Sequence, residues 1–429
     1  MANNFDSNVE KRLAASFIKN FESARVLTKT VNTQLVSGNN GINPKTGDTV
    51  FVRRPYEALA VETAKGDITG LTGDITSGQA PVTVQNFITT FAEWDIIDEA
   101  IRMDRMDEIL RPYATRLVTQ LEGNLGRFMQ RNSGLLSGVP GTPITKWSDV
   151  AAFNTLLESM GVPTLDGNAY AVLSPAVREN LADLQSGLAS GDNELVNQAW
   201  RKARISKDFG GITALSSNHI PTYQSGASVA RTGTIGATPT ATYVAAKDTM
   251  TQTVVLSGLT ASTVNAVRPG DQILITQAGR SRINPHTKEI IFDTGGDPVS
   301  WTYTVVTGGD TDGAGDVTVT VTGAAINEDG AYDNISTPIT SGDTFALLGN
   351  TNVSYQSALF YHRDAFALAS VRIPKLHSKD TIMESEDGFM IRMTRYSNGD
   401  ANTNKVRFDL LPAFGVLQPL FAGNGFGKP

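Results

Sequence analysis

The stretch WTYTVVTGGDTDGAGDVTVTVTG, residues 301–323, decides the fold of the middle of this chain. It holds two β-rich runs, Trp301–Val306 and Val317–Val321, separated by a turn of Gly and Asp residues. Similar short runs bounded by Gly, Asp, Pro or Asn occur at Val254–Leu256, Ile273–Ile275 and Phe345–Leu348. This spacing predicts a small antiparallel barrel or sandwich over residues 225–350.

The chain on either side of this β block has a different pattern. Upstream segments show helical periodicity, and a mixed pattern resumes at Ala358–Leu368 before a terminal hairpin. We therefore predict that the block is inserted into an α+β domain, since insertion is tolerated where the two ends of a surface loop lie close together. With 429 residues, the chain is also longer than one hydrophobic core usually supports.

Composition excludes several classes of protein and site. The chain has no cysteine, which rules out disulfides, thiolate nucleophiles and zinc–thiolate sites. It shows no secretory signal and no apolar run of membrane-spanning length, so we expect no membrane partner. The net charge is −7, and residues 225–350 hold six basic and twelve acidic residues, about −6 of that total. The near-neutral remainder argues against a dedicated nucleic-acid binder and favours a solvent-facing, acidic insert.

The N-terminal segment predicts an amphipathic helix. A capping box at Ser7–Glu10 opens a helix whose apolar stripe consists of Val9, Leu13, Phe17 and Phe21. The stripe packs either on its own domain, which is the simpler expectation, or on a neighbouring subunit or partner.

A long two-stranded arm is predicted next. Thr46–Pro55 forms a turn and a strand, and a return strand runs from Val82 to Trp94. Between them, Tyr56–Pro81 is a polar loop of about 25 residues, far longer than a hairpin loop. Because such an arm cannot bury a face on itself, we expect it to reach toward a neighbour.

A long helix follows, with a break near Met103–Asp107. Its apolar stripe has three- and four-residue spacing and consists of Leu110, Tyr113, Leu117, Leu121, Leu125 and Phe128. A helix over Asp107–Arg131 places Pro112 near the first turn and is roughly 37 Å long. Gly123 and Gly126 within it suggest a close crossing or a bend.

The remaining segments predict an α+β domain and a terminal hairpin. Helices are expected at Ser148–Met160, Ser174–Leu184 and Glu194–Lys202, and strands at Ala169–Leu173, Gly211–Leu215, Gly388–Arg395 and Lys405–Leu410. Gly-Asp turns are expected to lead into strands at Lys45–Asp48, Arg268–Asp271 and Thr340–Asp343.

The sequence favours structural over chemical explanations of its polar clusters. The four histidines lack metal-ligand spacing, and Asp310–Asp316 matches a calcium loop in part, although Ala314 and Val321 stand where ligands belong. The carboxylates over Glu93–Glu108 alternate with arginines, which is typical of solvated ion pairs. Gly423–Lys428 resembles a phosphate loop in composition and is expected to be a flexible tail. We therefore expect no catalysis, cofactor or metal.

The order of these elements resembles that of tailed-bacteriophage major capsid proteins of the Hong Kong 97 fold. More specifically, it is similar to podovirus coat proteins whose central domain is interrupted by a β-barrel. The matching stretches are Ala2–Val9, Thr142–Val150, Asn398–Asn402 and Arg407–Ala413. The resemblance covers essentially the whole chain, and within the insert it is mainly one of position and type.

This resemblance implies an α+β, Hong Kong 97-like fold with an inserted all-β barrel. Its parts would be an N-terminal arm with an amphipathic helix (1–45), an extended two-stranded arm (46–94), a spine-helix region (95–137), an axial domain in two parts (138–224 and 351–380), the inserted barrel (225–350), and peripheral strands with a C-terminal tail (381–429).

The resemblance also implies function and partners. The chain would be a non-enzymatic subunit that self-assembles into the hexamers and pentamers of an icosahedral shell around double-stranded DNA. Assembly would take place in the host bacterial cytoplasm with a scaffolding protein and a portal. The finished shell is part of the virion, and its contact with DNA would be non-specific.

In relatives, the insert projects outward, aids folding and sends a charged loop to a neighbouring capsomer. The corresponding turn here, residues 245–249, is short and lightly charged. Candidates for contacts between subunits are Arg53, Arg54, Glu62, Lys65, Asp67, Asp74, Lys247 and Asp248. The alternative is a non-catalytic surface binding or decoration protein whose β insert binds a ligand, but the long arm favours a shell.

Overall fold

The structure of the chain, a computed structural model, describes a large part of the sequence. It covers residues 17–33 except 23; 49–95 except 55, 56, 59, 61, 64 and 71–74; 106–186; 202; and 205–428 except 329, 378, 379, 386 and 387. The predicted capping box at Ser7–Glu10 and the predicted helix at Glu194–Lys202, apart from Lys202, lie outside these residues.

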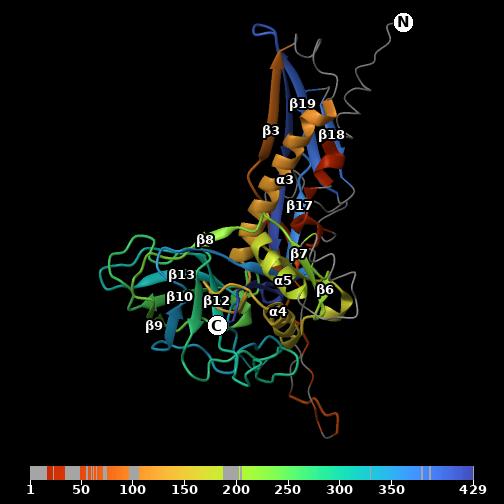
Figure 1. The fold of residues 1–429 in the computed structure, drawn as a ribbon. Helices are drawn as coiled ribbons and strands as arrows, with labels where there is room; N and C mark the ends of the chain where they lie inside the picture. Colours follow the sequence, from red (N-terminus) through yellow and green to blue (C-terminus); the bar gives the residue numbers. More distant parts are fainter. Residues whose placement is uncertain are drawn as a thin grey trace. The chain divides into compact units, whose positions relative to one another are not determined.

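The chain divides into two compact units. The first comprises Met1–Val52, Pro81–Gly126 and Ala367–Gly415, and the second comprises Arg53–Ala80, Arg127–Phe366 and Val416–Pro429. Helices and sheets occur together, and the second unit contains a closed barrel (Figure 1). The predicted α+β class with an inserted all-β barrel is therefore confirmed.

Two sheets belong mainly to the first unit. One has the order β18-β19-β20-β3, formed by β18(Thr381–Glu384), β19(Met390–Asn398), β20(Thr403–Leu410) and β3(Ile88–Asp95). The other has the order β1-β2-β21-β17, formed by β1(Thr49–Arg53), β2(Gln79–Val84), β21(Pro412–Val416) and β17(Phe366–Ser370). The predicted terminal hairpin is confirmed, because β19 and β20 pair along eight residues of each strand.

The predicted single return strand from Val82 to Trp94 is wrong. The chain breaks after β2, where the Gln85 N–H donates to the carbonyl of Pro412, and β3 pairs with β20 from Ile88 to Asp95. The two halves therefore lie in different sheets. Each half pairs with a C-terminal strand more than 300 residues away, and a local sequence pattern cannot show such a partner.

The predicted long helix is confirmed as α3(Met106–Arg131), with its leucine stripe buried. Pro112 lies in the second turn of this helix. A Cβ on Gly123 would meet no described atom within 4 Å, so the predicted close crossing does not involve this residue in the described chain. The helix also holds a buried carboxylate: Glu122 accepts hydrogen bonds from the N–H groups of Val26 and Thr28, next to the 3-10 turn η1(Leu27–Lys29).

The N-terminal apolar stripe packs within its own unit. Phe17 stacks on Phe408 with 3.8 Å between the ring centroids, and Phe21 meets Phe389 edge-on at 5.9 Å. Both N-terminal rings are fully buried. The expectation that this stripe packs on its own domain is confirmed for these two residues.

A six-stranded sheet with two flanking helices lies in the second unit, over residues that the resemblance assigns to an axial domain, and it is named the axial part for that reason. Its order is β4-β22-β16-β5-β7-β6, and its members are β4(Leu135–Ser137), β22(Ala422–Gly425), β16(Ala358–His362), β5(Ala169–Leu173), β7(Ile212–Ser216) and β6(Asp208–Phe209). The helices are α4(Trp147–Ser159) and α5(Pro175–Ser186), and the 3-10 turns are η2(Thr164–Asp166), η3(Arg363–Ala365) and η4(Pro419–Phe421). The predicted helices Ser148–Met160 and Ser174–Leu184 and the predicted strands Ala169–Leu173 and Gly211–Leu215 are confirmed within two residues.

The C-terminal segment is not a flexible tail, and that prediction is wrong. β22 is buried and pairs antiparallel with β16 and parallel with β4. A Cβ on Gly423 would lie 2.1 Å from the Phe360 ring, and a Cβ on Gly425 would lie 2.4 Å from the Phe153 ring. The glycines therefore let the backbone contact two stacked aromatic rings, a packing reason that composition does not reveal.

The inserted block is a closed barrel of six strands in the order β10-β13-β12-β11-β14-β9. The strands are β9(Thr232–Ala237), β10(Thr251–Ser257), β11(Gln272–Ile275), β12(Thr302–Thr307), β13(Val317–Thr322) and β14(Thr344–Leu347). The five predicted runs are confirmed as β10 to β14. Sequence reasoning missed β9 because its sequence, TGTIGA, contributes one buried apolar side chain, Ile235.

The barrel leaves and rejoins the axial part at one place. β8(Thr222–Gln224) and β15(Ser354–Gln356) pair antiparallel, with Tyr223 opposite Tyr355. The Ser225 hydroxyl donates to the carbonyls of Asn350 and Val353. The two ends of the insert are therefore adjacent, as expected for an inserted domain.

Both described Gly-Asp turns lead into barrel strands by one mechanism. The carboxylate of Asp271 accepts the N–H of Arg268, three residues earlier, and Asp343 does the same for Thr340. The intervening glycines have φ of +99° and +91°, which favours glycine. The third turn, Lys45–Asp48, lies outside the described residues.

The partial calcium motif is also a turn. The Asp312 carboxylate accepts the N–H groups of Ala314 and Asp316, and Gly315 has φ of +85°. The tight-turn interpretation of Asp310–Asp316 is therefore confirmed.

The barrel is also packed onto the axial part of its unit through residues outside the two connections. Ile291 is buried in the axial core beside α4 and β16 residues. Arg282 is buried, lies 4.2 Å over the Trp301 ring, and donates to the carbonyl of Gly134 at 2.9 Å. A Cβ on Gly323 would lie 3.1 Å from the Cα of Gly134, so the two backbones touch.

We predict that residues 225–350 fold when expressed alone. The barrel core, which includes Leu256, Ile273, Tyr303 and Phe345, consists entirely of insert residues. The expected result is a two-dimensional amide spectrum with dispersed signals. A collapsed spectrum typical of an unfolded chain would contradict the prediction.

We predict that Gly425→Ala destabilises the second unit by about 1–3 kcal/mol, because the added methyl group overlaps the Phe153 ring. The free energy of unfolding is measured by urea titration. Gly399→Ala is the control, since a Cβ there meets no described atom within 4 Å. Equal stability of the two variants would contradict the packing argument.

Candidate assembly surface

Most of the candidate contact residues in the arm are exposed. Arg53, Glu62, Lys65 and Asp67 all present their side chains to solvent. The Asp67 carboxylate accepts hydrogen bonds from the backbone N–H and the hydroxyl of Thr69, which closes a local turn. Asp74 lies outside the described residues. The exposed residues remain candidates for contacts between subunits.

Arg54 differs from them, because it is 3% exposed. Its guanidinium donates to the carbonyl of Leu417 and, at 3.0 Å, to the carbonyl of Asp248. Its backbone N–H donates to the carbonyl of Gly78 at 3.0 Å. Burial lowers the pKa of Arg54 to about 10, so the side chain remains charged at neutral pH. Arg54 is therefore an internal anchor in this structure and not an exposed contact residue.

Lys247 and Asp248, the candidates in the insert, lie beside Arg54. The Lys247 ammonium is 3.0 Å from the Asp248 carboxylate, and that carboxylate accepts the N–H of Gln79 at 3.1 Å. The structure thus brings three candidate residues of the sequence analysis together within one chain.

Sequence reasoning missed several exposed apolar side chains. In the arm, Ile68 is 69% exposed and Ile75 is 74% exposed. In the first unit, Phe51, Phe87 and Phe91 are each more than half exposed. Ile68 and Ile75 themselves, two large apolar residues within the otherwise polar loop 56–81, are the sequence signal for this exposure.

One face of the sheet β18-β19-β20-β3 combines aromatic and charged side chains. Phe91 lies opposite Arg407 in the strand register, and Glu93 lies opposite Lys405. The Lys405 ammonium is 2.9 Å from the Glu93 carboxylate. Glu93 therefore forms its described ion pair with a C-terminal strand and not with the nearby arginines that the sequence suggested.

A buried carboxylate organises the same sheet. Asp409 is fully buried and accepts hydrogen bonds from Arg392 at 2.6 Å, Arg407 at 2.6 Å and the Thr89 hydroxyl at 2.7 Å. Burial by itself would raise the pKa of Asp409, but the hydrogen bonds from Thr89, Arg392 and Arg407 outweigh it, so the pKa lies below its usual value.

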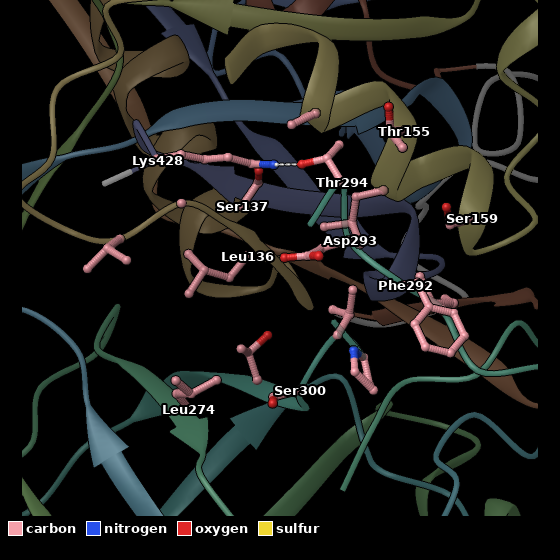
Figure 2. Close-up of a pocket in the computed structure, with 18 of the residues that line it drawn as sticks. Leu136, Ser137, Thr155, Ser159, Leu274, Phe292, Asp293, Thr294, Ser300 and Lys428 are labelled. Atoms are coloured by element: carbon pink, nitrogen blue, oxygen red, sulfur yellow. Dashed lines mark hydrogen bonds between the residues drawn. The ribbon is translucent and has the colours of Figure 1, made fainter. Parts of the chain in front are cut away.

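A cavity of about 340 Å³ lies within the second unit, lined by α4 and by insert residues 291–300 (Figure 2). The hydroxyls of Thr155, Ser159 and Ser300 line it, and the Lys428 ammonium donates to Thr294 at 3.2 Å. The Asp293 carboxylate accepts N–H groups of its own turn. Because its charged members are engaged by neighbours, the cavity is better explained as a gap between packed elements than as a reactive site.

Among the described residues, no group of three or more His, Asp or Glu side chains is arranged to hold a metal ion. No helix in the described part of the chain combines the length and apolar character needed to cross a bilayer.

Comparison with known proteins gives end-to-end matches. The family model of the P22 coat protein, gene protein 5, matches residues 1–427. A major capsid protein of Acyrthosiphon pisum secondary endosymbiont phage 1 is 37% identical over 432 residues, which cover 100% of both chains.

Among solved structures, a chain of Mycobacterium phage Che8 gives a TM-score of 0.46 at 12% identity and covers 93% of this chain and 90% of that chain. A chain of the mature capsid of bacteriophage PhiM1 gives 0.39 at 9% identity, with coverage of 88% and 81%.

We predict that Asp409→Asn lowers the free energy of unfolding at neutral pH by about 3 kcal/mol, because it leaves Arg392 buried without its counter-ion. The folded-state pKa of Asp409 is depressed, so its stabilisation is present above the unfolded pKa of about 3.9 and is lost as the pH falls through the folded pKa. The difference between the two proteins should therefore shrink below about pH 4.

Urea titrations at several pH values measure this difference. Glu93→Gln, which removes an exposed pair, is the control and should leave stability nearly unchanged. A difference between Asp409→Asn and the parent chain that is constant with pH would contradict the prediction.

Proposed function

Since this chain belongs to the P22 coat protein family and is a structural, non-enzymatic capsid protein of a phage, we propose that it builds an icosahedral shell from hexamers and pentamers. The observation that carries the proposal is the match along the whole length to a phage major capsid protein. The alternative, a surface binding protein whose insert takes a ligand, has no comparable support. The shell would enclose double-stranded DNA and form part of the virion.

We assign the parts of the chain by the same proposal. Residues 1–45 would be the N-terminal arm, 46–94 the extended arm, 95–137 the spine region, 138–224 with 351–380 the axial domain, 225–350 the insert, and 381–429 the peripheral strands and tail. The strand pairing of β2 and β3 with C-terminal strands supports a narrower definition of the arm, with residues 53–80 as its projecting part.

The exposed side chains of the arm support a contact with a second copy. Ile68 and Ile75 expose most of their apolar surface, and Glu62, Lys65 and Asp67 add charges beside them. Burying such side chains against a neighbour would be favourable by about 25 cal/mol per Å² of apolar surface. Closed shells repeat each such contact many times, so that modest contacts suffice.

Further partners follow from the same proposal. A scaffolding protein and a portal would act during assembly in the host bacterial cytoplasm. Packaged DNA would touch the shell by non-specific contact, which agrees with the near-neutral charge of the chain outside residues 225–350.

The proposal predicts shells or capsomer rings when the chain is expressed with the scaffolding protein of its phage. Sedimentation and negative-stain microscopy measure the product. Replacement of both Ile68 and Ile75 by Asp should reduce the shell fraction about tenfold or more, since the contact would then bury charges.

Val229→Asp, at a position of the insert that is 75% exposed, is the matched control and should assemble normally. Circular dichroism checks that each variant is folded. A parent chain that stays a strict monomer with its scaffold would overturn the proposed function.

A further inference from the structure

We propose that the inserted domain anchors the base of the arm. It would hold the base of the arm in the free subunit, so that the arm is already oriented when it meets a second copy. The inference rests on the proposed function for the arm's role in assembly, but the contacts between the insert and the arm base belong to a single chain. All the residues concerned belong to the second compact unit.

The first set of hydrogen bonds involves a buried arginine. Arg54, where the chain enters the arm, donates to the carbonyls of Asp248 in the insert and Leu417 in the C-terminal segment. On the returning side of the arm, the N–H of Gln79 donates to the Asp248 carboxylate at 3.1 Å. Asp248 therefore binds both sides of the arm base, one through its carbonyl and the other through its carboxylate.

The second set of hydrogen bonds involves a tyrosine of the insert. The Tyr332 hydroxyl donates to the carbonyl of Thr76 at 2.6 Å and accepts the N–H of Glu57 at 3.3 Å. Its ring stacks on Tyr243 of α7(Tyr243–Ala246), with centroids 3.4 Å apart and planes 3° apart. The hydroxyl again bridges the outgoing and returning sides of the arm, and the stack fixes where it points.

The two surfaces also fit closely. A Cβ on Gly78 would lie 2.0 Å from the carbonyl oxygen of Lys247, so the backbone of the arm rests directly on the backbone of the insert. On the other side, His286 of the insert lies 3.4 Å from the Glu57 carboxylate. The arm base is thus held by backbone contact, a ring hydroxyl and a buried cation.

The arm base is held more strongly than the rest of the described arm. Releasing the base would break the hydrogen bonds of a buried charge, which are each stronger than those of neutral groups. Beyond it, Glu62, Lys65, Asp67 and Ile68 are exposed. The arm base is therefore fixed at Arg54, at Glu57 and at residues 76–79, whereas the exposed residues described beyond it can contact another subunit.

Hydrogen exchange on the full-length, unassembled subunit tests whether the insert anchors the arm base. Tyr332→Phe removes the bridging hydroxyl and keeps the ring stack, and it should speed exchange at residues 57 and 76–79 about fivefold, the factor for one hydrogen bond. Gly78→Ala forces a methyl group against Lys247 and should speed exchange there further. Amides of the barrel strands β10 and β13 should keep the rates of the parent chain.

Two matched controls should leave exchange at the arm base unchanged. Gly313→Ala adds a methyl group in the insert where no described atom lies within 4 Å, and Tyr396→Phe removes an exposed hydroxyl in the first unit. If Gly78→Ala does not fold, Tyr332→Phe still decides. Unchanged exchange at the arm base in Tyr332→Phe, or an equal rise in exchange across the barrel, would overturn the proposal that the insert anchors the arm base.

Assembly with the scaffold gives the second measurement. Subunits with a released base should close into shells at a yield about tenfold lower than the parent chain, because the arm must then be ordered during assembly. Faster exchange at the base with an unchanged shell yield would show that the contact has no role in assembly and would overturn the inference. Failure of the parent chain to form shells would instead overturn the proposed function.

Discussion

The pairing of the last strand, β22, between β4 and β16 is the interaction on which the rest of the second unit depends. β4 follows the spine helix, and β16 follows the return from the insert, so these strands are more than 200 residues apart in sequence. β22 joins them into one sheet. Just before β22 in the chain, the carbonyl of Leu417 accepts a hydrogen bond from the Arg54 side chain. The C-terminal residues therefore complete the axial sheet and hold the arm base, which makes the fold depend on long-range contacts.

The insert has a larger structural part than its sequence suggests. Its composition and acidic charge predict an independent decoration, and its barrel does have a core of its own. Yet Ile291 is buried in the axial core, Arg282 binds the carbonyl of Gly134, and Tyr332 bridges both sides of the arm base. An insert with these contacts links the axial part of the second unit to the arm, so it contributes more than solubility.

How far the sequence predicts this fold depends on the range of the interactions. Barrel strands such as β13 and the spine helix α3 carry their own periodicity, and local patterns predict them correctly. β22 consists of Gly, Ala and Asn residues, and β9 adds one large apolar residue, Ile235, to Gly, Thr and Ala. Both are strands because distant partners pair with them. The candidate contact residues divide in the same way. Exposure of Glu62 and Lys65 follows from a polar loop, whereas burial of Arg54 depends on Leu417, which no local pattern connects to it.

Burial also changes the meaning of the charge of the insert. All six of its basic residues are buried or half-buried: Arg231, Lys247, Arg268, Arg280, Arg282 and Lys288. Arg280 is paired with Asp343 inside the domain. Five described aspartates, in contrast, are exposed: Asp248, Asp293, Asp297, Asp310 and Asp312. The surface that the barrel offers to solvent is therefore more acidic than the count of residues alone indicates. Such a surface repels the phosphate backbone of DNA, which favours an insert that projects outward from the shell, as the resemblance to podovirus coat proteins implies.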